Sequence, residues 1–93
     1  MNEEQREQLR LIVDEISAAL TEDYASGRYR LNNYNYAKDA LDALAMLRSE
    51  IAGSDERSAS ALVDNVMDRY AKLHADAEGF GVGVLVDVKN RMS

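Results

Sequence analysis

The chain contains no cysteine, no proline and no tryptophan among its 93 residues, and each absence excludes something. Without cysteine there is no disulfide framework, no thiolate zinc site and no cysteine nucleophile. Without proline, the turns depend on glycine, serine and asparagine. A chain of this length forms one domain, which we expect to span residues 1–93 and to have a thin core.

Long apolar runs are missing as well. No stretch reaches the roughly 18 apolar residues of a transmembrane helix, so the sequence predicts no membrane partner. The first five residues are polar and acidic, the opposite of a signal peptide. Together with the absence of cysteine, these features predict a cytoplasmic protein.

Positive charge is scarce and acidic residues dominate, giving a formal net charge of -6. Residues 1–25 hold seven acidic and two basic side chains, whereas residues 26–36 hold two arginines and no acid. An acidic surface repels phosphate backbones and attracts basic proteins, which argues against nucleic acid as the partner. The alternative interpretation is that the charge only keeps a small domain soluble.

Three segments have the apolar periodicity of amphipathic helices. The first is predicted from Glu3 to Tyr24, with Leu11 off the main stripe but able to widen the buried face. The second is predicted from Tyr34 to Ala52, capped by Asn32 or Asn33. The third is predicted to begin after an N-cap at Ser54 and to end at Gly79, with a stripe of Ala59, Leu62, Val63, Val66, Tyr70, Leu73 and Ala77.

The last segment, residues 80–92, has two interpretations. Phe80, Val82, Val84, Val86 and Val88 alternate as in a β-strand, whereas Val84, Leu85, Val88 and Met92 follow helical spacing. We therefore predict an all-α fold, a small bundle of three main helices with a C-terminal fourth helix. The alternative is a C-terminal β-strand that pairs with Arg28–Leu31 or with its copy in a homodimer, since a lone strand needs a partner.

No catalytic, metal or cofactor motif is present. His74 has no companion ligands at metal-binding spacing, and Asp64 with Asp68 is typical of the solvated side of a helix. The glycine-rich stretch 79–83 lacks the framework of a phosphate-binding loop. The sequence thus predicts a non-enzymatic protein with no cofactor and no metal.

The best binding candidate is the acid-free segment 28–36. Arginine and tyrosine dominate the energetics of protein interfaces, and they also bind phosphates and stack on bases. The structural alternative is that the tyrosines pack over helix ends while the arginines neutralise the first helix. The predicted binding residues are Arg28, Tyr29, Arg30, Asn33, Tyr34 and Tyr36.

These features predict a non-catalytic interaction protein, an inhibitor or adaptor of a protein partner, that forms a homodimer. Small acidic helical proteins of this size are common among phage-encoded inhibitors of bacterial defence systems, an analogy of size and charge alone. The alternative function is the binding of a nucleotide-like ligand or a nucleic acid through the segment Arg28–Tyr36.

Overall fold

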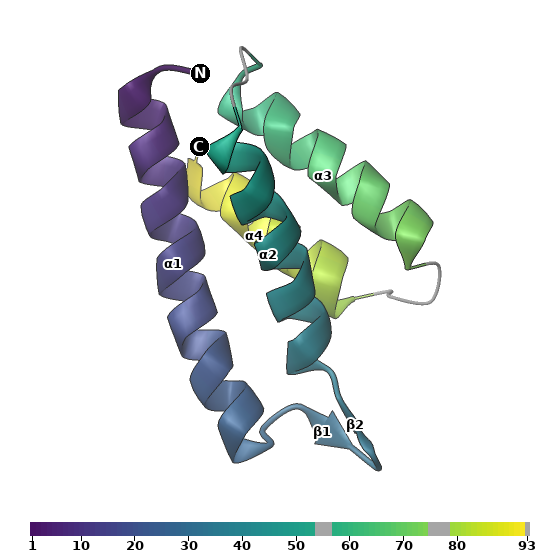
Figure 1. The fold of residues 1–93 in the computed structure, drawn as a ribbon. Coiled ribbons are helices and arrows are strands. Elements are labelled where there is room, and N and C mark those ends of the chain that lie inside the picture. The colour runs from purple at the N-terminus through teal and green to yellow at the C-terminus, as the bar shows by residue number, and fades with distance from the viewer. Residues whose placement is uncertain (54–56, 75–78, 93) are drawn as a thin grey trace.

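The computed structural model describes residues 1–53, 57–74 and 79–92. Within them lie, in chain order, α1 (Glu3–Ser26), β1 (Arg30–Leu31), β2 (Tyr34–Asn35), α2 (Ala37–Ala52), α3 (Ala59–Leu73) and α4 (Phe80–Met92). The central helix α2 contacts α1, α3 and α4 (Figure 1). The predicted all-α bundle with a C-terminal fourth helix is confirmed. None of the helices in these ranges combines the length and apolarity needed to cross a membrane.

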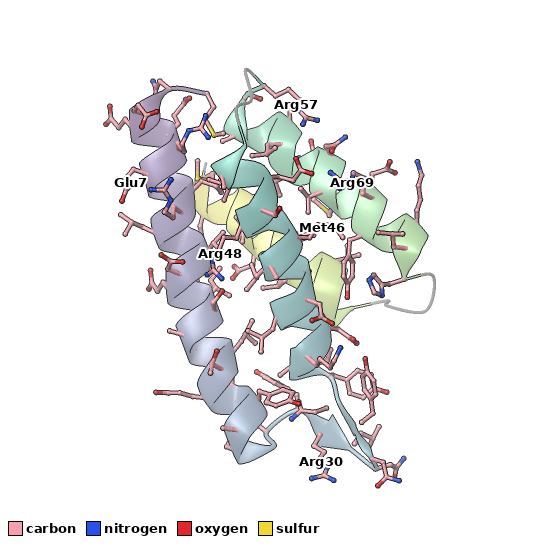
Figure 2. The ribbon with its side chains drawn as sticks, in the orientation of Figure 1. Glu7, Arg30, Met46, Arg48, Arg57 and Arg69 are labelled. Carbon is pink, nitrogen blue, oxygen red and sulfur yellow. The ribbon has the colours of Figure 1, made fainter. Side chains whose placement is uncertain are left out.

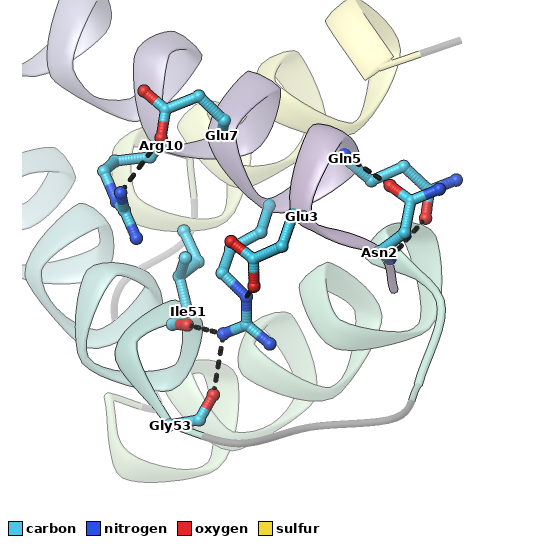
Figure 3. Close-up of polar contacts among 8 residues, drawn as sticks. Asn2, Glu3, Gln5, Glu7, Arg10, Ile51 and Gly53 are labelled. Atoms are coloured by element: carbon cyan, nitrogen blue, oxygen red, sulfur yellow. Dashed lines mark hydrogen bonds and ion pairs between the residues drawn. The ribbon is translucent and has the colours of Figure 1, made fainter.

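Helix α1 is held at both ends by its own sequence. At its start, the Asn2 side chain accepts from the Gln5 N–H at 2.8 Å and the Gln5 side chain accepts from the Asn2 N–H at 3.1 Å (Figure 3). At its end, Gly27 adopts the left-handed conformation with φ 73°. Leu11 is 60 % exposed and does not widen the buried face, which consists of Leu9, Val13 and Ile16.

Helix α2 begins at Ala37 and not at Tyr34, because Tyr34 and Asn35 pair with β1. The predicted capping by Asn32 or Asn33 is also wrong. The Asn35 carboxamide oxygen accepts a hydrogen bond from the Ala37 N–H at 3.1 Å instead. Small side chains on the buried face let neighbouring helices approach closely, and that face carries Ala37, Ala40, Ala43, Leu44, Leu47 and Ile51.

Helix α3 begins after Ser58, whose hydroxyl accepts a backbone N–H bond of 3.1 Å from the first turn. The predicted N-cap, Ser54, lies outside the described residues, as does Ala77 of the predicted stripe. The predicted end at Gly79 is wrong, because α3 ends at Leu73. Tyr70 is buried as expected, but Leu73 is 68 % exposed because no described element covers it.

Helix α4 decides between the two interpretations of the valine-rich segment. Leu85 and Val88 are fully buried, while Val86 is largely exposed, which is a helical and not an alternating pattern. The C-terminal strand, and its pairing with Arg28–Leu31 or across a dimer, is therefore wrong, and β1 pairs with β2 instead. Because α4 fills the core, truncation after Gly79 should unfold the bundle and not merely separate a dimer.

A close approach between α3 and α4 depends on Gly81. A Cβ atom at this position would lie 2.1 Å from Cε1 of the buried Tyr70 ring. The Tyr70 hydroxyl also donates to the Asp39 carbonyl oxygen at 3.1 Å, which links α3 to the start of α2. Burial raises the pKa of Tyr70 to about 12.

Arg6 joins α1 to the end of α2. Its guanidinium donates from Nη1 to the carbonyl oxygen of Ile51 and to that of Gly53, the latter at 2.9 Å (Figure 3). These carbonyls are left without helical partners where α2 ends, and a cation there also suits the helix dipole. The Arg6 side chain of α1 thus caps the C-terminal end of α2, which is far from it in sequence.

Candidate functional site

The segment that the sequence singled out forms a small hairpin beyond the end of α1. Arg30 pairs with Asn35 and Leu31 with Tyr34, leaving Asn32 and Asn33 as the two-residue turn. Asn32 has φ 56°, a left-handed conformation that asparagine tolerates better than most residues. Figure 1 shows the hairpin at the end of the molecule away from both chain termini.

Alternation along the strands gives the hairpin two chemically different faces. Tyr29, Leu31, Tyr34 and Tyr36 share one face, because Leu31 opposes Tyr34 and side chains two apart in a strand point the same way. Arg30 opposes Asn35 on the other face. The hairpin therefore presents an aromatic face and a polar, cationic face.

The aromatic face is anchored to the first residue of α4. The Tyr29 and Phe80 rings meet edge to face with centroids 5.0 Å apart, and the Tyr36 and Phe80 rings stack at 5.6 Å. Tyr34 meets the Tyr36 ring at 4.8 Å, again edge to face. These are favoured geometries for aromatic pairs, so Tyr29 and Tyr36 hold the hairpin on the bundle. The structural interpretation of these two tyrosines is supported.

Hydrogen bonds fix the hairpin to the two helices that flank it. Asn35 Nδ2 donates to the Tyr24 carbonyl oxygen at 2.9 Å at the end of α1. The Tyr34 hydroxyl donates to the Asp39 carboxylate in the first turn of α2, and this bond raises the pKa of Tyr34. The hairpin is thus tied to α1, α2 and α4, although the strands themselves are only two residues each.

The two arginines have different surroundings. Arg28 Nη1 lies 3.6 Å from Asp23 Oδ1, and its guanidinium sits 5.5 Å from the centre of the Tyr29 ring. Arg30 donates from Nε to the Asn32 carbonyl oxygen at 3.3 Å, but makes no ion pair within the part of the chain that the structure describes. Figure 2 shows the Arg30 side chain at the hairpin end of the molecule, directed away from the helices. Arg30 therefore carries a charge that is available to another molecule.

A polar pocket of about 390 Å³ lies beside the cationic face. Three of the predicted binding residues line this pocket: Arg30, Asn33 and Tyr34. The other three do not, because Tyr29 and Tyr36 pack against Phe80 and Arg28 pairs with Asp23. The sequence reasoning missed three further lining residues, Tyr24, Asn35 and Lys38.

The missed residues had weak signals in the sequence. Tyr24 and Lys38 belong to helices on either side of the hairpin, so only the turn of the chain brings them together. The Lys38 ammonium bonds the Asp42 carboxylate at 2.8 Å, and this hydrogen bond raises the pKa of Lys38. Phe80 was assigned to the ambiguous tail, where nothing indicated that it would anchor the hairpin.

The other candidate residues have ordinary structural partners. The exposed His74 ring stacks on Tyr70 with centroids 4.5 Å apart. Asp64 pairs with Lys89 at 2.8 Å and Asp68 with Lys72 at 3.0 Å. Among residues 1–53, 57–74 and 79–92, no cluster of three or more His, Cys, Asp or Glu side chains could hold a metal ion.

Comparison with known proteins finds no matching family model, no similar curated protein and no similar solved structure. The hairpin is therefore the feature from which a function can be inferred, because some of its side chains are engaged within the fold and others remain exposed.

Proposed function

We propose that this chain is a non-catalytic interaction protein, an inhibitor or adaptor, that binds a protein partner through the exposed side chains at the tip of its hairpin. The observation that carries this proposal is Arg30, a guanidinium without an ion pair among the described residues, on a hairpin whose base is anchored. Leu31 and Tyr34, which are 61 % and 44 % exposed, lie on the other face of the same short strands.

The anchored base favours binding because it reduces the ordering required on association. Tyr29 and Tyr36 pack on Phe80, so the exposed residues are presented on a preformed support. A preorganised loop loses less conformational freedom when it binds. Arginine and tyrosine are among the residue types enriched at interface hot spots. A carboxylate on the partner would form a charge-assisted hydrogen bond with the Arg30 guanidinium.

The two arginines provide a matched test. Arg30→Ala and Arg28→Ala remove the same charge two residues apart, but only Arg28 has an acidic partner within the described chain. We expect Arg30→Ala to weaken partner binding by about thirtyfold, corresponding to the loss of about 2 kcal/mol from a hot-spot arginine. Arg28→Ala should weaken it by less than about threefold, because that guanidinium is already engaged.

The measurement is quantitative recovery of bound proteins from a lysate of the source organism on immobilised parent and variant chains. A partner is identified as a protein whose recovery falls with Arg30→Ala and survives Arg28→Ala. Both variants should keep the parent melting temperature, since both side chains are exposed. If every recovered protein binds the two variants equally, the hairpin is structural and the acidic helix surfaces become the better candidate.

A second candidate function is the binding of a nucleotide-like ligand in the polar pocket, which is favoured by its lining of two cations, two tyrosines and two asparagines. A nucleotide at 100 times its dissociation constant would stabilise the fold by about 2.7 kcal/mol. A thermal-shift series with nucleoside mono-, di- and triphosphates tests this. A shift that is lost in both Arg30→Ala and Lys38→Ala would favour the ligand over the protein partner.

Self-association stays a prediction of the thin core, although the valine-rich segment is not its strand. Sedimentation velocity of the intact chain at high micromolar concentration tests it. A monomer under these conditions would contradict the homodimer.

A further inference from the structure

A second concavity lies on the hairpin end of the bundle. It is an open groove of about 380 Å³ between α1, the base of the hairpin, the first turn of α2 and the first turns of α4. Most of its surface is apolar, and five of its lining residues are Leu20, Tyr29, Ala40, Phe80 and Val84. Arg30 and Tyr34, which carry the proposed function, do not line it.

One edge of the groove is a stripe that begins at Gly79, just before α4, and continues along α4. Gly79, Gly83 and Asp87 follow one another at intervals of four residues along this edge. Glycine weakens a helix, so a helical glycine needs a reason. Gly81 has one in the Tyr70 ring, but a Cβ atom at Gly83 would meet nothing within 4 Å. Packing among residues 1–53, 57–74 and 79–92 therefore explains Gly81 and leaves Gly83 unexplained.

Among the described residues that line the groove, the one charged group is acidic. Asp87 is half exposed, and its carboxylate lies 3.3 Å from Arg91 Nε. Arg91 Nη1 also lies 4.0 Å from Glu15 Oε1, so Arg91 has a second carboxylate beside it. A carboxylate has two oxygens and can accept from more than one donor. Asp87 can accordingly receive a cation from another molecule without leaving Arg91 unpaired.

We propose that this groove is the docking site for an amphipathic helix of a partner protein, which buries apolar side chains against Leu20, Phe80 and Val84. The bare backbone at Gly83 allows that helix to approach α4 closely, and a lysine or arginine of the partner pairs with Asp87. A net charge of -6 favours such a basic partner and repels a second copy of this chain. The groove shares Tyr29 and Phe80 with the anchor of the hairpin, but it includes neither Arg30 nor Tyr34, so the two proposals are tested by different variants.

The probe is a fluorescein-labelled helical peptide with leucines at i, i+3, i+4 and i+7 and lysines at both ends, compared with a twin whose lysines are glutamates. Fluorescence anisotropy should show binding of the lysine peptide only. With ¹⁵N-labelled protein, amide shifts should concentrate at residues 79–87 and around Leu20, Tyr29 and Ala40.

The decisive variant is Gly83→Leu, which places a side chain in the groove at a position where a Cβ atom meets nothing within 4 Å among the described residues. Ala45→Leu is its matched control, since it adds leucine at an exposed position of α2. Gly83→Leu should weaken peptide binding by about tenfold or more, and Ala45→Leu should leave it unchanged. Asp87→Asn should weaken it several-fold, whereas Arg30→Ala, which damages only the hairpin surface, should not.

Three results of the peptide experiments would overturn the proposal. They are no binding of the lysine peptide at millimolar concentrations, equal binding by Gly83→Leu and the parent, and amide shifts confined to the outer acidic surface of α1. Self-association of the free chain that Gly83→Leu abolishes would also overturn it, by identifying a second copy as the occupant.

Discussion

Replacing Arg6 by methionine should remove one of the few polar links between α1 and α2 while keeping the apolar stem of the side chain. The side chain is only 18 % exposed, and its two acceptors are the Ile51 and Gly53 carbonyl oxygens. A hydrogen bond to a charged group that is shielded from water makes a net contribution of about 1.5–3 kcal/mol to stability. The exposed bond to Gly53 contributes little, because water can replace it. The variant should therefore lose about 2 kcal/mol, or about 10 °C in melting temperature for a domain of this size.

The assay is urea unfolding followed by circular dichroism at the helical band, with Arg10→Met as the matched control. Arg10 lies one turn further along α1, and its one ion pair with a described residue is with Glu7 at 3.0 Å on the surface, so its loss should cost less than about 0.5 kcal/mol. Arg6→Lys should fall between parent and methionine, because an ammonium lacks the planar guanidinium fork. If Arg6→Met and Arg10→Met unfold at the same urea concentration, the link to the end of α2 contributes nothing and the reasoning fails.

Gly81→Ala should destabilise the fold by about 1–3 kcal/mol, because the added methyl group overlaps the fixed Tyr70 ring. Gly83→Ala should stabilise the fold by up to about 1 kcal/mol, because alanine favours the helix and meets no neighbour there. Equal melting temperatures of the two variants would refute this contrast. Burial raises the pKa of Tyr70 from 10.0 to about 12. The neutral Tyr70 side chain therefore contributes on the order of 2–3 kcal/mol to the free energy of unfolding below about pH 10, and this contribution is lost as the pH rises through about 12. Urea midpoints measured across this range should fall in the parent and much less in Tyr70→Phe, and parallel curves would exclude Tyr70 as the cause. Ile16→Asp should abolish the helical dichroism signal, because it places a charge in a site that is 8 % exposed, and a variant with parent stability would remove this face from the core.

Local pattern was sufficient to predict the helices. Leu9, Val13 and Ile16 are buried as their spacing required, and so is Tyr70 on α3. Helix ends were harder to predict, because Leu73 continues the apolar period although no described residue buries it. For residues 80–92 the sequence favoured a helix but left a strand as the alternative, and the burial of Leu85 and Val88 together in the core confirms the helix.

The candidate site was only half predictable. Residue types identified the segment 28–36 as a candidate. They could not show which of its residues are free to bind and which pack within the fold, because this depends on contacts with residues far away in the sequence. Tyr29 and Tyr36 pack against Phe80, and Arg28 pairs with Asp23, whereas Arg30 has no ion pair among the described residues. The hairpin itself was missed because strands of two residues leave almost no alternation to detect.

The contact between the hairpin and Phe80 also sets an order of events during synthesis. Phe80 lies more than forty residues beyond Tyr29 and Tyr36, and it follows α3 in the chain. While the polypeptide is being made, α1 and the hairpin emerge early, but the ring that supports the hairpin emerges only after three helices have been translated. A nascent chain therefore carries the hairpin with its hydrogen bonds to α1 and α2 but without the Phe80 contact, and the full support forms only once α4 has docked. A partner that recognises the proposed surface would meet it in its fully supported form only on chains that have finished folding.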